Sequence, residues 1–412
     1  MELGLRDKLF RYVAYEEALR RALESVRLLE AEEVPLLGSV GRVLAEDVRA
    51  SRDVPPRLIS LVDGYAISSE DTAGASASTP VRLRASRSVY IGEEPGSLSR
   101  GEAIYVATDA YLPEGADAVV PVEAVRQEGD FVELRAPVSP GSYVLPAGGD
   151  VSAGQVILEA GRIVAPQDLE LLAESGILKL RVRRKPIVAL IPVGSELSYT
   201  REGGKKLEIR HAIVSEALRR HGAKAIAMPI APDDPSKIRE IVQKALDEAD
   251  VVVTIGGTSV GRRDYVWATL KAMSEFEPMF RGLRLKPGRV TSMARVRGKP
   301  VVLLAGHFQS MIVGLIYVLL PMVRHMIGLE PDVRRVVARG RLSEDVGGSK
   351  FKKFRRIVFV RVEEGRVVPL RGPSFCRAPV ARSHGFVEVP EGVELLRAGE
   401  EVNVLAAYGL WG

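Results

Sequence analysis

The chain has 412 residues, 46% of them hydrophobic, so it is long enough for two to four domains with proper cores. Its 58 basic and 53 acidic residues leave a net charge of +5, which suits small anionic ligands and does not indicate a nucleic-acid partner. A single cysteine excludes an intrachain disulfide, and with no signal peptide and no apolar run of about 18 residues we expect a cytoplasmic protein with no membrane partner.

The first 180 residues fall into three stretches with different patterns. Residues 1–50 have helical spacing, most clearly over 15–24. Residues 51–140 alternate short β-type runs with Gly, Pro and Ser turns, which predicts a small all-β insertion. Residues 141–180 return to longer segments and include a helix with Pro166 near its start and Gly176 after its end.

Residues 181–327 alternate apolar strands with helices, and this pattern predicts a parallel α/β sheet. Residues 328–412 switch to β signals again, which we interpret as a small β-barrel. The expected strands of the sheet are 187–193, 225–228, 251–255 and 301–304, and the expected helices are one that ends at His221, 235–248 and 310–327.

Polar loops follow three of these strands, at 192–196, 256–261 and 305–310. Ligands of an open parallel sheet bind outside the carboxyl ends of its strands, so three such loops indicate one crevice. The middle loop is rich in bare backbone N–H groups that can hold an anion, although its glycines fit tight strand-to-helix packing equally well. Arg262 and Arg263 exclude a P-loop, because they stand where it needs a lysine and a hydroxyl residue.

Carboxylates near these loops are candidate metal ligands. Asp264 could hold Mg²⁺ beside a bound anion, and the alternative is that it only caps the following helix. Asp234 before Pro235 has the pattern of a helix cap, which leaves Asp233 freer to face the crevice. Glu196, at the end of a strand, is harder to explain by packing.

Two cations, Lys286 and Arg289, surround a Lys-Pro-Gly-Arg turn. They are candidates for binding an anion, but a solvated surface turn has the same composition. In the expected β insertion, Asp63 precedes Gly64 in a pattern that is also a hairpin signal.

Six segments, in order along nearly the whole chain, resemble motifs of the molybdopterin molybdenumtransferase family (MoeA type), which includes the E domain of gephyrin. So many ordered motifs are hard to match by chance, and the chain is similar to a divergent archaeal or thermophilic member. The segments are Ser60–Ala66 (similar to SAMDGYA), Thr108–Val120 (TGAPLPEGADAVV), Gly194–Leu197 (TGDEL), Gly256–Asp264 (GGVSVGxxD), Lys286–Arg289 (KPGK) and Leu304–Ser310 (LPGNPVS).

This resemblance implies a multidomain α/β protein that forms a homodimer. Each active site would lie between the α/β domain of one subunit and the β insertion of the other. The implied domains are an elongated one (1–50 and 141–180), an inserted β domain (51–140), a MogA-like α/β domain that binds molybdopterin (181–327) and a C-terminal β-barrel (328–412).

The implied reaction is the Mg²⁺-dependent insertion of molybdate into adenylated molybdopterin, with release of AMP. The molybdopterin adenylyltransferase is an expected partner. The implied metal ligands are Glu196, Asp233 and Asp264, and the implied catalytic residues are Lys286 and Arg289 with Asp63 and Thr108 from the other subunit. The implied molybdopterin-binding residues are Gly256, Gly257, Thr258, Ser259, Gly261, Gly306 and Ser310.

Several residues at the crevice depart from the family pattern. His307 and Phe308 stand where the family has Asn and Pro, and Ala305 replaces the Pro before them. Asp109 replaces a Gly, and Ser195 replaces an Asp. These departures support a second hypothesis: a homologue of altered specificity, or one that binds molybdopterin without catalysis and acts as a scaffold.

Overall fold

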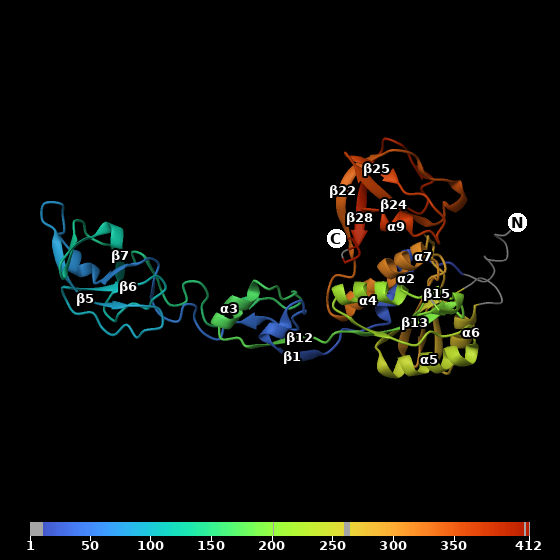
Figure 1. Ribbon diagram of the computed structural model, residues 1–412, viewed down its shortest axis with the longest axis horizontal. Helices are drawn as coiled ribbons and strands as arrows, with labels where there is room; N and C mark the ends of the chain where they lie inside the picture. Colours follow the sequence, from blue (N-terminus) through green and yellow to red (C-terminus); the bar gives the residue numbers. More distant parts are fainter. Residues whose placement is uncertain (1–10, 201, 259–263, 408, 412) are drawn as a thin grey trace. The chain divides into compact units, whose positions relative to one another are not determined.

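The computed structural model describes residues 11–200, 202–258, 264–407 and 409–411. By their contacts the residues form two compact units (Figure 1). The larger unit combines the chain up to Ala31 with Arg183–Gly412, and the smaller unit is Glu32–Val182. Each unit has apolar cores of its own, as expected of a separate folding body.

A six-stranded sheet in the smaller unit confirms the predicted β insertion; its order is β7-β4-β6-β5-β9-β8. Along β4, Tyr65 and Ile67 point into one core and Ala66 points into another. Because side chains alternate along a strand, both faces of this sheet are buried. The strands are β4 (Gly64–Ile67), β5 (Val81–Val89), β6 (Glu102–Val106), β7 (Ala118–Pro121), β8 (Arg126–Glu128) and β9 (Phe131–Leu134).

The rest of the smaller unit is built from short strand pairs that join two stretches far apart in the sequence. Leu44 from the first stretch packs with Leu172 and Val182 from the second. The pairs are β1 (Ala31–Pro35) with β12 (Lys179–Arg183), β2 (Val48–Arg49) with β11 (Val156–Leu158) and β3 (Ile59–Ser60) with β10 (Val144–Leu145), and the unit's helix is α3 (Asp168–Glu174).

Helix α2 (Tyr15–Glu24) lies in the larger unit, which differs from the prediction that residues 1–50 belong to the elongated domain. Ala18 and Ala22 are fully buried, and the ring of Tyr15 lies 5.1 Å from that of Tyr317. An amphipathic helix shows which of its faces is apolar but not which body that face will cover, so the sequence could not locate α2.

The larger unit contains a mixed sheet in the order β16-β13-β17-β21-β20-β18. The first four strands are parallel, which confirms the predicted α/β arrangement. The antiparallel strands β20 and β18 were missed, because charged residues such as Glu277 and Arg295 interrupt their apolar pattern. The strands are β13 (Ile187–Val193), β16 (Lys224–Ala227), β17 (Val251–Gly256), β18 (Phe276–Arg281), β20 (Ser292–Val296) and β21 (Lys299–Leu304).

Helices cover both faces of this sheet. Val242 and Val266 pack on one face, and Val214 and Leu218 pack on the other. Since neither face meets water, the central strands are almost wholly apolar. The helices are α4 (Arg210–Arg220), α5 (Pro235–Glu248), α6 (Tyr265–Lys271), α7 (Phe308–Gly314), the π-helical segment η5 (Leu315–Leu319) and α8 (Leu320–Met326).

The segment Phe308–Met326 is long and apolar enough to cross a membrane by length and composition. However, 83% of it is buried inside the protein, where it forms the central core helix. Its tyrosine, Tyr317, donates a hydrogen bond to Glu388 (2.5 Å). The hydroxyl of this buried tyrosine is therefore satisfied.

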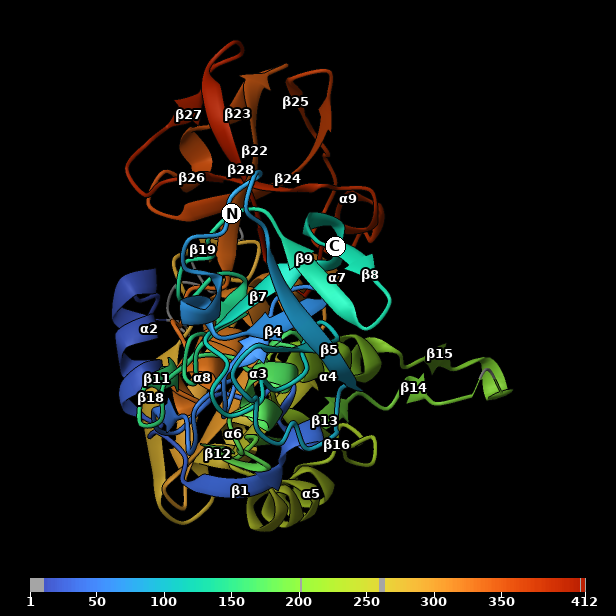
Figure 2. The ribbon, with the colours of Figure 1, turned by 90° about the vertical axis from the view of Figure 1, so that its left-hand side faces the viewer.

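The predicted C-terminal β-barrel is confirmed. Five strands follow one another in the order β24-β25-β22-β28-β26, and β26 pairs back with β24 to close the barrel (Figure 2). The short strand β19 (Leu285–Lys286) pairs with β24 and so joins the α/β part to the barrel. The barrel strands are β22 (Arg334–Leu342), β24 (Arg355–Glu363), β25 (Arg366–Pro369), β26 (Gly385–Val389) and β28 (Glu401–Ala407).

Several small elements complete the larger unit. They are β14 (Leu197–Ser198), β15 (Lys206–Leu207), β23 (Val346–Gly347), β27 (Leu395–Leu396) and the short helix α9 (Ala378–Ala381).

Candidate functional site

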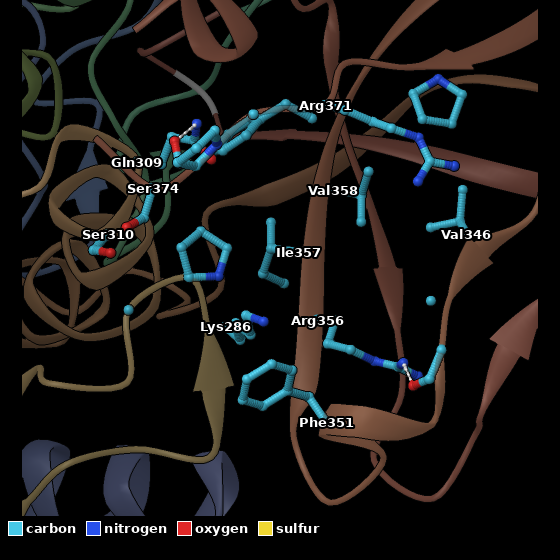
Figure 3. A pocket seen from close by; sticks show the side chains of 18 of the residues that line it. Lys286, Gln309, Ser310, Val346, Phe351, Arg356, Ile357, Val358, Arg371 and Ser374 are labelled. Atoms are coloured by element: carbon cyan, nitrogen blue, oxygen red, sulfur yellow. Dashed lines mark hydrogen bonds between the residues drawn. The ribbon is translucent and has the colours of Figure 1, made fainter. Parts of the chain in front are cut away.

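A cavity of about 790 Å³ lies in the larger unit, where the turn after β19 and the start of α7 meet the barrel (Figure 3). Gln309, Ser310 and Ser374 stand on one side of it, and Arg371 stands on the opposite side. The cavity exists because β19 and β24 are paired, which brings loops of both parts together. Its lining comes from segments 286–289, 309–310, 346–351, 356–359 and 369–374.

Basic side chains dominate this cavity: five line it, and none of the described lining residues is acidic. Two of the five are already engaged. Arg371 donates to a carboxylate oxygen of Glu344 (2.8 Å), and Arg356 donates to the carbonyls of Gly348 (2.6 Å) and Glu394 (2.9 Å). These two arginines therefore also hold the wall of the cavity in place.

The other three cations, Lys286, Arg289 and Lys350, have no ion pair within the described ranges of the chain. Burial, followed by the positive charges of Arg289, Lys350 and Arg356, lowers the pKa of Lys286 to about 8. Its Nζ lies 3.1 Å from the centroid of the Phe351 ring, which partly compensates the charge. Unpaired cations that repel one another are stabilised by an anion, so the charge of this cavity suits an anionic ligand.

Asp264 caps a helix, which is the predicted alternative to metal binding. It is the N-cap of α6, where it accepts a hydrogen bond from the backbone N–H of Trp267 (3.4 Å). Its other carboxylate oxygen lies 2.7 Å from Nη2 of Arg281. Burial raises the pKa of Asp264, and Arg281 opposes that rise. In this arrangement Arg281 balances the negative charge of Asp264.

Glu196 and Asp233 lie on two loops that are in contact. The backbone N–H of Ser195 donates to Asp233 (3.3 Å), and the N–H of Asp233 donates to the Ser195 hydroxyl (2.9 Å). Over the described ranges there is no group of three or more His, Cys, Asp or Glu residues that could hold a metal ion. Glu196, Asp233 and Asp264 thus do not form such a group in the free protein, and Asp264 is paired with Arg281. Asp234 caps α5, as predicted.

The first glycines of the middle loop are explained by packing. Gly256 has a φ of 97°, and a Cβ there would lie 2.6 Å from the carbonyl oxygen of Val193. A Cβ on Gly257 would lie 2.6 Å from a methyl group of Val266. Neither glycine nor Thr258 lines the cavity, whereas the predicted Ser310 does. Gly306 lies beside Gly256, and the predicted Ser259 and Gly261 fall outside the described residues.

The structure brings Asp63 and Thr108 together in the smaller unit. The backbone N–H of Thr108 (2.7 Å) and its hydroxyl (3.0 Å) both donate to one oxygen of Asp63, and these bonds lower the pKa of Asp63. Asp109, which departs from the family glycine, has a φ of 64°. Aspartate tolerates this left-handed region better than most residues, so the change preserves the turn.

Sequence reasoning missed the cations that the barrel contributes, Lys350, Arg356 and Arg371. The segment 350–356 is a visible basic run, but such a run usually marks a solvated surface. Only the pairing of β19 with β24 turns part of it toward Lys286. The sequence therefore shows that this segment is positively charged, but it does not show which way the charged side chains point.

Comparison with known proteins defines the class first. Residues 13–176 match the MoeA N-terminal region (domain I and II), and residues 189–325 match the "Probable molybdopterin binding domain". The protein is thus a multidomain protein of molybdenum cofactor biosynthesis.

Full-length relatives define the family. The chain is 30% identical over 398 residues to "Molybdopterin molybdenumtransferase 2" of Mycobacterium tuberculosis (strain ATCC 25618 / H37Rv), covering 94% of this chain and 98% of that protein. It is 29% identical over 399 residues to the molybdopterin molybdenumtransferase of Staphylococcus aureus (strain MSSA476), covering 95% of each. A solved MoeA protein from Pyrococcus horikoshii has a TM-score of 0.84 and 32% identity, over 98% of this chain and 100% of that one. The chain belongs to the MoeA family of molybdopterin molybdenumtransferases.

Proposed function

We propose that this chain inserts molybdate into adenylated molybdopterin, with release of AMP, in a reaction that requires Mg²⁺. The observation that carries the proposal is the cavity with three unpaired cations and no acidic lining residue among those described, in a member of this transferase family. Lys286 and Arg289 belong to both the family-like turn and the cavity.

The chemistry explains why such a cavity is needed. A pyrophosphate and an oxyanion must be held close together although they repel each other. Lys286, Arg289 and Lys350 would offset that repulsion, and charge-assisted hydrogen bonds from these side chains would orient the anion. Burial and neighbouring cations destabilise the charged form of Lys286 in the free protein. A bound anion would stabilise that charge, and this stabilisation would add to the binding free energy.

For Mg²⁺ we restrict the candidate protein ligands to Glu196 and Asp233. Mg²⁺ is usually held by one or two carboxylates together with substrate phosphates, so two exposed carboxylates on touching loops fit this ion. When bound, the ion would polarise the phosphate bond that breaks. Asp264 is left out of the set because of its pair with Arg281.

The proposal includes a homodimer in which Asp63 and Thr108 act at the other subunit's site. The support is that these residues form a tight hydrogen-bonded pair on an exposed loop of the smaller unit. We also propose a cytoplasmic location, since a single cysteine suits a reducing compartment. We further propose that a molybdopterin adenylyltransferase supplies the substrate.

The test is an assay of the purified chain with adenylated molybdopterin, molybdate and Mg²⁺, scored by AMP release. We expect AMP release that requires both molybdate and Mg²⁺. Failure to release AMP, where another MoeA protein turns over in parallel, would overturn the catalytic proposal.

A second candidate function is ligand binding without turnover, or turnover with altered specificity. The neutralised Asp264 and the replaced residues His307 and Phe308 favour it. In the same assay this candidate predicts molybdopterin binding without AMP release.

A further inference from the structure

His307 ends the loop after β21 and is the N-cap of helix α7, but its side chain does not cap that helix. Asn, Ser, Thr and Asp are preferred at such positions because they bond to the helix's own N–H groups. The imidazole instead reaches across to the barrel, where Nδ1 lies 2.9 Å from Oγ of Ser374. Its ring also packs edge-on against Phe375, with 6.1 Å between the ring centroids.

Gln309 fixes the backbone around the same serine. Its N–H donates to the carbonyl of Ser374 (3.0 Å), and its side-chain amide donates to the carbonyls of Pro373 (2.9 Å) and Cys376 (3.0 Å). Gln309 is only 5% exposed, so these bonds form in a largely dry place. Three hydrogen bonds from Gln309 therefore hold the backbone around Ser374.

The hydroxyl of Ser374 belongs to the cationic cavity. Ser374 lines it together with Lys286, Arg289 and Lys350, whereas His307 does not (Figure 3). A serine hydroxyl has one proton, so it can donate either to the imidazole or to a bound anion, but not to both. The partner behind the serine decides which way the proton points.

A neutral imidazole offers one N–H donor and one acceptor. Partial burial, followed by the positive charges of Arg210 and Lys206, lowers the pKa of His307 and so favours the neutral ring. If Nδ1 carries the proton, it donates to Ser374 and leaves the serine proton free for the cavity. If Nδ1 is the acceptor, the serine turns its lone pairs toward the cavity, which an anion disfavours.

We propose that His307 is a positioning residue, whose Nδ1–H orients the Ser374 hydroxyl as a donor to an oxyanion in the cavity. This inference rests on the proposed function, since it takes the cavity to be the oxyanion site. It gives a role to one of the residues that depart from the family pattern. The family's asparagine can place an amide N–H near the position of Nδ1, so the same task can be done by either residue.

The test measures molybdate binding to the full-length protein by titration calorimetry. His307→Asn keeps a donor near the Nδ1 position, whereas the longer amide of His307→Gln reaches toward the Nε2 position. We expect His307→Asn to bind within about twofold of wild type, and His307→Gln and Ser374→Ala to bind roughly tenfold more weakly, as for a lost bond to a charged group. His325→Leu, on α8 and outside the cavity lining, is the control for histidine replacement.

A double-mutant cycle shows whether His307 acts through Ser374. In the Ser374→Ala background, His307→Gln should cause no further loss. Equal binding by the Asn and Gln variants, or an undiminished effect of His307→Gln without the serine, would overturn the inference. If the folded wild-type protein binds no molybdate at all, the proposed oxyanion cavity itself is wrong and the inference falls with it.

Discussion

The surroundings of Lys286 disfavour the positive charge that this side chain carries at neutral pH. Its pKa of about 8 lies below the usual 10.5, because burial and three neighbouring cations disfavour the charged form. Between about pH 8 and 10.5 the unfolded chain therefore binds more protons than the folded one at this site. It follows that this lysine makes the free protein more stable as the pH rises through that window.

Anion binding should show the opposite dependence on pH. The anion needs a charged Lys286, so we expect molybdate affinity to fall as the pH rises above 8, approaching tenfold per pH unit. Lys286→Arg stays charged and should flatten this profile up to about pH 10, as measured by calorimetry between pH 7 and 10.

Lys352→Met is the matched control, because Lys352 is exposed, pairs with Glu394 and does not line the cavity. It should keep the wild-type profile. A flat wild-type profile from pH 7 to 9.5 would show that Lys286 does not bind the anion.

At the scale of elements, the loop between β17 and α6 must both pack closely after the strand and start the next helix. Gly256 and Gly257 are required where the strand turns against Val193 and Val266, since neither position has room for a Cβ. Asp264 then starts the helix as its N-cap. Glycines and an aspartate at this spacing are thus explained by packing and capping, and the motif alone could not separate that role from ligand binding.

This distinction is testable on α6. Asp264→Ala removes both the cap and the partner of Arg281, so we expect a loss of about 2–3 kcal/mol in the free energy of unfolding, measured with urea. Asp264→Asn keeps a good cap and removes only the charge, so it should lose less. Wild-type stability in Asp264→Ala, combined with a higher Mg²⁺ concentration needed for AMP release, would instead support the metal role.

At the scale of the whole molecule, the proposed site needs residues from both compact units. Asp63 and Thr108 belong to the smaller unit, and Lys286 belongs to the larger one. In a symmetric dimer with shared sites, a chain that lacks one of these functions can be rescued by a chain that lacks the other.

Mixing two inactive variants tests this arrangement. Asp63→Ala and Lys286→Met, unfolded and refolded together, should recover about a quarter of wild-type AMP release, because half of the dimers are mixed and each has one intact site. Each variant refolded alone is the control and should stay inactive. No recovery in demonstrably mixed dimers would show that both residues serve the site of a single chain.

Much of the fold could be predicted locally. The α/β sheet was predicted from the apolar runs at 187–193 and 251–255 and from the helix at 235–248. A strand that is buried on both faces is apolar along its whole length, so it can be recognised in the sequence. Strands β18 and β20 were missed because charged residues break their pattern. The site was only partly predictable: Lys286, Arg289 and Ser310 line the cavity, whereas Asp264 caps α6 and pairs with Arg281.

What the sequence by itself determined was the family, the order of the elements and the residue types available for chemistry, since periodicity and motifs depend on neighbours along the chain. The tertiary structure decided which charges are paired and which are left free. Asp264 meets Arg281 from the next strand, whereas the charged groups that act on Lys286 are all cations, because β19 lies against the barrel. Coulomb energies depend on distance through space, and that distance is set only when segments remote in sequence pack together.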